Sequence, residues 1–130
     1  MTDLPETPKD RLAPGNSIAS VQAYLRDFAN QRDWQQYHNP KNLAMALSVE
    51  ASELLEIFQW LSAGQAKDLN PQQREAASHE MADVFLYLLR LADQLDIDLW
   101  AAVALKTKLN EERYPADKVR GSSKKYSDYT

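Results

Sequence analysis

Two apolar segments of this sequence each carry a pair of acidic residues three positions apart. "VEASELLEIFQW" (residues 49–60) contains Glu50 and Glu53, and "HEMADVFLYLLRLA" (79–92) contains Glu80 and Asp83. Residues three apart on a helix project side by side, so each pair presents its two carboxylates together. The surrounding Leu, Val and Phe side chains require both helices to be largely covered. A fold for this chain therefore has to bring acidic groups to the margin of a helical core.

The positions of the glutamates around the first helix can be read from the rotation of about 100° per residue. Glu50 falls inside the apolar arc centred on Leu47, Glu53 lies just outside the edge of that arc, and Glu56 lies roughly opposite. On the second helix, Glu80 and Asp83 project on the same side. The pattern predicts that both pairs face the helical core or its margin and that Glu56 faces solvent or stands behind the residues of a site.

The rest of the chain also has helical spacing. Ser17 is a suitable N-cap for a first helix that runs until Asn39-Pro40 interrupts it. Further helices are predicted over about 40–63, ended by Gly64, over about 71–95, and from Asp96 or Asp98 to Pro115. No strand pattern stands out, so the predicted fold is an all-α bundle of four main helices with short connections.

Length and composition predict one domain with two polar extensions. Residues 1–16 are a proline-rich arm, 17–114 the helical domain, and 115–130 a basic polar tail. A net charge of −4 argues against a nucleic-acid duplex as the main partner. The absence of cysteine excludes zinc–thiolate sites and thiol nucleophiles. Neither a signal peptide nor a membrane-spanning run is recognisable, so a cytoplasmic location is expected.

Four converging carboxylates would need compensation. Two such charges about 5 Å apart repel by roughly 3 kcal/mol at an effective dielectric of about 20, so the groups either take up protons or hold cations. Oxygen-only ligands suit Mg²⁺ or Mn²⁺. A di-iron site is set aside, because the residues three after Glu50 and Glu80 are Glu53 and Asp83 rather than histidine. The alternative is a non-catalytic helical oligomer or binding module whose acidic pairs only tune the interface.

Several segments together resemble a known family. "RDWQQYHNPKNLAMALSVEASELLEIFQW", "EMADVFLYLLRLA", "KLNEERYP" and "RGSSKKYSD" are similar to the MazG-like all-α nucleoside triphosphate pyrophosphohydrolases, in particular the small dCTP pyrophosphatase branch. The resemblance implies the all-α fold of that family, a homo-oligomer assembled as a dimer of dimers, and Mg²⁺-dependent cleavage of a triphosphate to monophosphate and pyrophosphate. The chain departs from its relatives at Val49 and Ser52, where they have glycine, which leaves the acidic residues in place.

The resemblance also implies roles for individual residues. The metal ligands would be Glu50, Glu53, Glu80 and Asp83, with Glu53 and Glu50 as the catalytic carboxylates. Trp34, His38 and Trp60 would line the base pocket, and Tyr87, Lys106 and Asn110 would lie near the sugar and phosphates. The two tryptophans could equally be core or interface aromatics. The expected substrate is a (deoxy)pyrimidine triphosphate such as dCTP or a modified form, and a dUTPase-like activity on the same fold is the alternative.

Overall fold

The computed structural model describes residues 17–129, so the predicted proline-rich arm lies outside the described residues. Six α-helices and one 3-10 helix are described: α2 (Ile18–Gln31), α3 (Pro40–Phe58), α4 (Ala63–Lys67), α5 (Pro71–Gln94), α6 (Leu99–Arg113), α7 (Ala116–Val119) and η1 (Tyr126–Tyr129). Within this range the chain forms no strand, which confirms the all-α prediction. None of these helices combines the length and apolar character needed to cross a membrane.

The described chain forms two compact units. The first ends at Asp96 and contains α2 to α5, and the second begins at Ile97 and contains α6, α7 and η1. Since α6 belongs to the second unit, the bundle of four helices stays a prediction, as do the domain boundaries. The acidic pairs both lie in the first unit, whose packing is described next.

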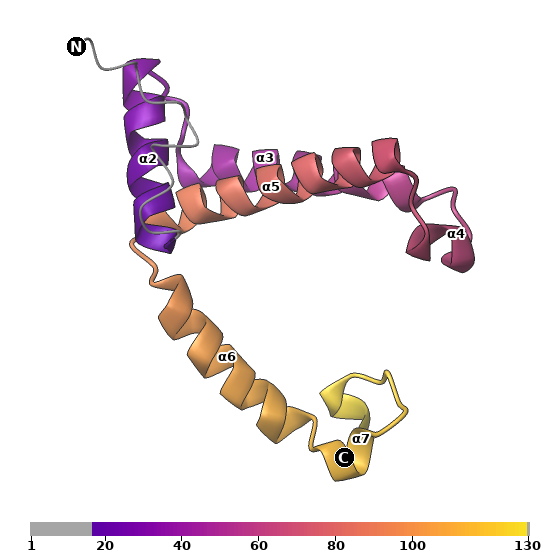
Figure 1. Ribbon diagram of the computed structural model, residues 1–130. Helices are drawn as coiled ribbons and strands as arrows, with labels where there is room; N and C mark the ends of the chain where they lie inside the picture. Colours follow the sequence, from indigo (N-terminus) through magenta and orange to yellow (C-terminus); the bar gives the residue numbers. More distant parts are fainter. Residues whose placement is uncertain (1–16, 130) are drawn as a thin grey trace, which may run out of the picture. The chain divides into compact units, whose positions relative to one another are not determined.

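The first unit is built on the antiparallel pair α3 and α5, which lie side by side, with α2 packed across the C-terminal end of α5 (Figure 1). Its buried apolar side chains come from all three helices: Ala29, Leu43, Ala77, Leu89 and Ala92. The side chain of Gln22 donates a hydrogen bond of 3.0 Å to the carbonyl oxygen of Leu89, which ties α2 to α5. This packing fixes the face of α5 that is directed toward α3.

Polar caps define where the helices start. Ser17, Asn39, Ser62, Asn70 and Asp98 each accept a backbone N–H of the first turn through the side chain. Each cap satisfies a donor that the helix itself leaves without a partner. The predicted starts at 18, 40 and 71 are confirmed, and of the two candidate caps for α6, Asp96 and Asp98, the structure uses Asp98.

Two predicted helix ends are wrong. The first helix stops at Gln31 instead of continuing toward Asn39-Pro40, because Asp33 adopts a left-handed conformation (φ 55°) and the N–H of Trp34 turns back to the carbonyl of Ala29. The second stops at Phe58 rather than near residue 63. Ser62 there forms a capping box with Gln65 and starts α4, so Gly64 lies inside a short helix and does not end one.

The buried leucines of α3 and α5 should carry much of the stability of the first unit. Leu89 is fully buried, and we expect Leu89→Ala to lower the free energy of unfolding by about 3 kcal/mol through lost burial and a residual cavity. Gln72→Ala, at an exposed position of the same helix, is the matched control and should change it by less than about 0.5 kcal/mol. Denaturant unfolding followed by circular dichroism measures both, and equal midpoints would contradict this account of the core.

Candidate metal centre

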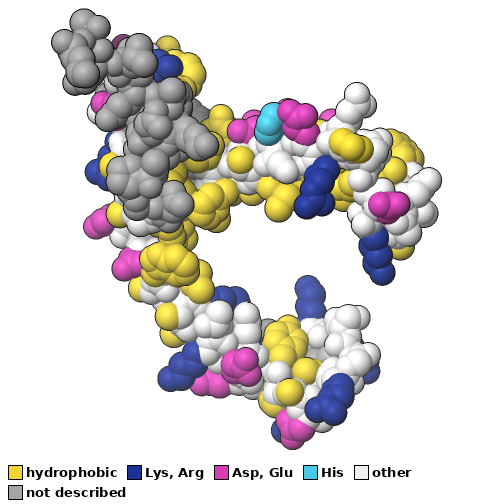
Figure 2. Space-filling model, in the orientation of Figure 1, with side chains coloured by type: hydrophobic (Ala, Val, Ile, Leu, Met, Phe, Trp, Pro, Cys, Tyr) yellow, Lys and Arg dark blue, Asp and Glu magenta, His cyan; other side chains and the backbone are white. Residues whose placement is uncertain are grey.

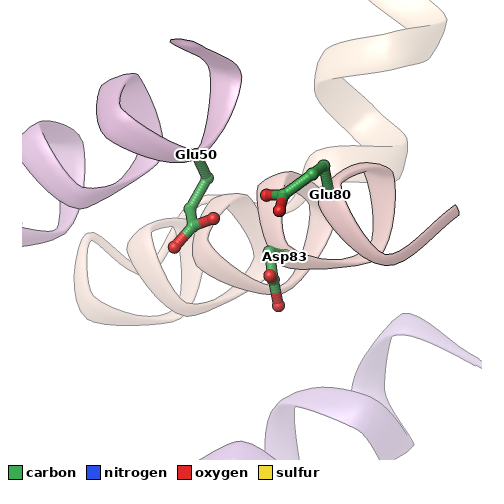
Figure 3. A group of neighbouring side chains, drawn as sticks. All are labelled: Glu50, Glu80 and Asp83. Atoms are coloured by element: carbon green, nitrogen blue, oxygen red, sulfur yellow. The ribbon is translucent and has the colours of Figure 1, made fainter. Parts of the chain in front are cut away.

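Three of the four predicted carboxylates converge between α3 and α5. Glu50 comes from α3, and Glu80 and Asp83 come from α5 one turn apart (Figure 3). Each offers one oxygen, and these oxygens all lie within 4.8 Å of one another. All three residues are half-buried. The antiparallel packing of α3 on α5 therefore produces the acidic cluster that the sequence predicts, and we call these residues the acidic triad.

The triad contains oxygen atoms that the described protein leaves without a donor. Oε2 of Glu50 and Oε2 of Glu80 are buried and have no hydrogen-bond partner among the described residues. A buried carboxylate oxygen in that situation loses hydration without compensation. Hard divalent cations take oxygen ligands, so the donor set and the spacing fit Mg²⁺ or Mn²⁺. The acidic triad is therefore a candidate metal-binding site.

The electrostatics of the triad show the cost of its charges. Burial raises the pKa of Glu50 from 4.5 to about 7, and the neighbouring carboxylates of Glu53, Glu80 and Asp83 contribute to the increase. Taking up a proton and binding a cation are thus two alternative ways to offset the repulsion within the cluster.

Glu53 differs from the other three acidic residues. Its side chain is exposed, next to Glu50 but outside the group of converging oxygens. Glu56 is also exposed. These positions agree with the helical rotation, which placed Glu50 inside the apolar arc, Glu53 at its edge and Glu56 opposite. Glu53 therefore lies at the margin of the triad with an exposed side chain.

A pocket of about 160 Å³ adjoins the triad. It is lined by side chains of α2, α5 and the segment 32–39: Leu25, Phe28, Trp34, His38, Asp83, Leu86, Tyr87 and Arg90. Asp83 belongs to both the triad and the pocket wall. The structure therefore brings Trp34, His38 and Tyr87 together beside the acidic cluster, and their roles toward a substrate stay predictions.

The aromatic side chains of this pocket form a connected series. The rings of Phe28 and Trp34 meet edge to face with centroids 5.8 Å apart, and the Trp34 and His38 rings are 6.1 Å apart. Tyr87 completes the wall from α5, and its pKa is raised by burial and by the charges of Glu50 and Asp83. Its hydroxyl therefore stays protonated and can donate a hydrogen bond toward the acidic side of the pocket.

Arg90 is a pocket residue that the sequence analysis did not identify. It lies within the apolar run of α5, yet its guanidinium is directed at the segment that carries Trp34 and His38. It donates hydrogen bonds to Nδ1 of His38 (3.3 Å) and Oε1 of Gln35 (3.0 Å). The only signal in the sequence is a charged residue inside "FLYLLRLA", which could have suggested a buried, partnered arginine.

Of the remaining predicted site residues, Trp60 lies away from this pocket in the first unit, and Lys106 and Asn110 belong to the second unit. Trp60 is 86% exposed and follows the C-terminal end of α3, whereas Trp34 and His38 precede its N-terminal end. The 19 residues of α3 span about 28 Å, which separates Trp60 from the other two. Lys106 and Asn110 are exposed on α6 in the second unit. Their roles near a substrate stay predictions.

Comparisons with known proteins point to one family. Residues 45–129 match the model of the MazG-like family. The chain is 40% identical over 129 residues to dCTP pyrophosphatase 1 of Homo sapiens, covering 92% of this chain and 76% of that protein. It is 41% identical over 114 residues to the protein of the same name from Bos taurus, covering 86% and 68%. A crystal structure of a pyrophosphatase from Archaeoglobus fulgidus superposes with a TM-score of 0.71 at 40% identity, over 75% of this chain and 92% of that one.

The raised pKa of Glu50 predicts how the metal-free protein responds to pH. Between pH 4.5 and about 7 the unfolded chain releases this proton while the folded chain keeps it, so the free energy of unfolding falls as pH rises. We expect a contribution of about 1–2 kcal/mol, less than the full shift because solvent screens part of the effect. Melting curves of metal-free protein from pH 4.5 to 8 measure it.

The Glu50→Gln variant isolates the contribution of this group. Its melting temperature should exceed that of the wild-type protein at pH 8, because glutamine carries no charge there. At pH 4.5, where the Glu50 of the wild-type protein is protonated, the difference should be smaller. Adding Mg²⁺ at pH 8 should raise the melting temperature of the wild-type protein and not that of the variant. The same pH dependence of the melting temperature in the wild-type protein and the variant would contradict the assignment of Glu50 to the acidic cluster.

Proposed function

Because this chain belongs to the MazG-like family and is a nucleoside triphosphate pyrophosphatase, we propose that it hydrolyses a pyrimidine deoxynucleoside triphosphate, dCTP or a modified dCTP, with Mg²⁺ held at the acidic triad. The observation that carries the proposal is the position of Asp83, which belongs to both the triad and the wall of the aromatic pocket. A nucleotide whose base enters the pocket would thus have its phosphates near the carboxylates.

The dimensions of the pocket favour a single base. At about 160 Å³ it is smaller than the roughly 300–1,000 Å³ that enclose drug-sized ligands. Trp34 and Phe28 offer apolar ring surfaces, and His38 and Tyr87 supply polar atoms at the wall. Such a site holds a flat heterocycle by its faces and reads its edge by hydrogen bonds. The sugar and triphosphate then extend toward Asp83.

The residues of the acidic centre have separate tasks in the proposed reaction. Bound divalent ions would neutralise the triphosphate and lower the pKa of a coordinated water. Glu50, Glu80 and Asp83 would hold these ions through their converging oxygens. Glu53, exposed beside Glu50, is available to orient the attacking water and accept its proton. The water attacks the α-phosphorus, the α–β anhydride bond breaks, and pyrophosphate leaves.

We also propose that the functional protein is a homo-oligomer, as a dimer of dimers. Large apolar side chains are exposed on α3 and α5 of the first unit, including Met45, Val49, Met81 and Phe85. In Figure 2, apolar side chains gather along one edge of this helix pair. A shallow groove in this surface is lined by Leu54, Met81, Ala82, Val84, Phe85 and Leu88. An exposed apolar surface of this kind is typical of a subunit interface.

Assembly would also account for Trp60. If Trp60 contacts the base, as the resemblance implies, it has to do so in the pocket of another copy, because α3 separates it from the pocket of its own chain. In this proposal each site combines the acidic triad and aromatic pocket of one subunit with the exposed Trp60 of a partner.

Turnover of a nucleotide panel tests the reaction. Purified protein with Mg²⁺ should convert dCTP or 5-methyl-dCTP to the monophosphate and pyrophosphate, and removal of the metal by EDTA should abolish turnover. Chromatography of the products against dUTP, dTTP and purine triphosphates gives the preference. Release of orthophosphate in place of pyrophosphate would contradict cleavage of the α–β bond.

Variants of the acidic residues test the assignment of the centre. We expect Asp83→Asn and Glu53→Gln to lower kcat at least 100-fold, because the first loses a metal ligand and the second the group that accepts the water's proton. Glu56→Gln, on the exposed side of the same helix as Glu53, is the matched control and should keep its activity. Melting curves establish that each variant folds. Full activity in both Asp83→Asn and Glu53→Gln would refute the assignment.

Mixing two variants tests whether Trp60 acts in a neighbouring subunit. Trp60→Ala should raise the KM for the nucleotide, and Asp83→Asn should abolish turnover. Subunits of the two variants that are unfolded and refolded together should contain some sites with both native residues, and these sites should recover a low KM for part of the activity. A mixture with no more low-KM activity than the separate variants would show that Trp60 does not act in trans.

A further inference from the structure

Arg90 is the only charged residue that is fully buried in the described part of the chain, with 3% of its surface exposed. Its guanidinium contacts Asp93 (3.4 Å), which also pairs with Arg26 of α2 (3.1 Å). The other hydrogen bonds go to Gln35 and to Nδ1 of His38, both in the segment 32–39. A buried guanidinium is costly unless its donors are matched, and here two of the acceptors lie on the segment that forms the pocket wall.

The hydrogen bond from Arg90 determines which ring nitrogen of His38 carries the proton. The Nε–H of Arg90 donates to Nδ1 of His38, and a nitrogen that accepts a hydrogen bond has no proton of its own. The neutral imidazole then carries its proton on Nε2. Burial and the positive charge of Arg90 lower the pKa of His38, which keeps the ring neutral at pH 7. The polar group that His38 can still offer to a ligand is therefore an Nε2–H donor.

We propose that Arg90 is a specificity-determining positioning residue, which acts through His38 by holding it as an Nε2–H donor at the wall of the base pocket. The matching ligand is a base with an acceptor at the edge that meets His38. Cytosine has an unprotonated N3, whereas uracil and thymine carry a proton there. The proposal places N3 of the base against His38, where the Nε2–H donor is matched by the N3 of cytosine and opposed by the N3–H of uracil and thymine. This inference rests on the proposed function and adds the origin of its base preference.

The alternative explanation for Arg90 is purely structural, since it also anchors the segment 32–39 through Gln35. The two explanations differ in what they predict. A structural anchor, when removed, weakens binding of every nucleotide alike. A residue that sets the proton position on His38 changes the ratio between cytosine and uracil substrates.

The proton position on His38 can be measured without any substrate. Two-dimensional ¹H–¹⁵N spectra of the imidazole nitrogens, recorded on nucleotide-free protein at pH 7, should show an unprotonated Nδ1 and a protonated Nε2 for His38. The exposed His79, the other histidine of the chain, serves as the internal reference. Arg90→Met removes the donor and should give a mixture of tautomers. Arg26→Gln, which touches Asp93 and not His38, should leave the His38 signals unchanged. A protonated Nδ1 in the wild-type protein would overturn the proposal.

Kinetics then test the selectivity. The ratio of kcat/KM for dCTP to that for dUTP should fall about tenfold in Arg90→Met, the effect of one lost hydrogen bond, mainly through the KM for dCTP. His38→Ala should reduce the ratio similarly, and adding Arg90→Met to it should cause little further loss. Arg90→Lys keeps a charged donor and should restore part of the ratio, and it replaces Arg90→Met if that variant does not fold.

The outcomes separate this inference from the proposed function. An equal loss of kcat/KM for dCTP and dUTP in Arg90→Met would leave Arg90 a structural anchor and refute its role in specificity. A wild-type protein without turnover on any triphosphate would refute the proposed function, and the nitrogen signals of His38 would still report whether Arg90 fixes the tautomer.

Discussion

The repulsion among Glu50, Glu80 and Asp83 is the interaction on which the rest of this structure depends. The antiparallel packing of α3 on α5 forces their oxygens to within 4.8 Å of one another, and two buried oxygens have no donor in the described protein. The buried leucines Leu43 and Leu89 hold the two helices together in spite of this cost. A protein that maintains such a cluster has strained electrostatics until a proton or a cation enters, which links ligand binding to stability.

One stripe of α5 connects the acidic centre to the base pocket. Glu80, Asp83, Tyr87 and Arg90 follow one another at intervals of three or four residues, so they lie along the same side of the helix. Along this stripe the proposed role changes from metal ligand to pocket wall to anchor of the segment 32–39. Because a single rigid helix carries all four, the distance between the phosphate site and the base site would be fixed by helix geometry and not by a loop.

Capping residues and helical periodicity were sufficient to predict most of the helices of this fold. They failed to predict where a helix ends when the turn depends on contacts elsewhere in the structure. The capping residues Ser17 and Asn70 and the helical rotation around Glu50 were readable from the sequence, and so was the pairing of acidic residues on two helices. The start of α6 was left open between Asp96 and Asp98, and Asp98 is the cap. The end of α2 at Gln31 was not, because no residue type in that region demands the left-handed conformation that Asp33 adopts. Arg90 was missed for a related reason: its meaning depends on His38 and Gln35, which are 52 and 55 residues away in sequence.

The exposed apolar side chains of the first unit bear on the same electrostatic problem. Met81 directly follows Glu80 and Phe85 comes two residues after Asp83, yet both side chains are about half exposed in the described part of the chain. In the proposed oligomer a second copy covers this surface, and burying it adds free energy to the same helices whose carboxylates repel. Assembly would therefore stabilise α3 and α5 independently of the cation. The apolar interface would then offset part of the repulsion among the carboxylates in the metal-free protein. The site would stay folded before the nucleotide and its ions bind.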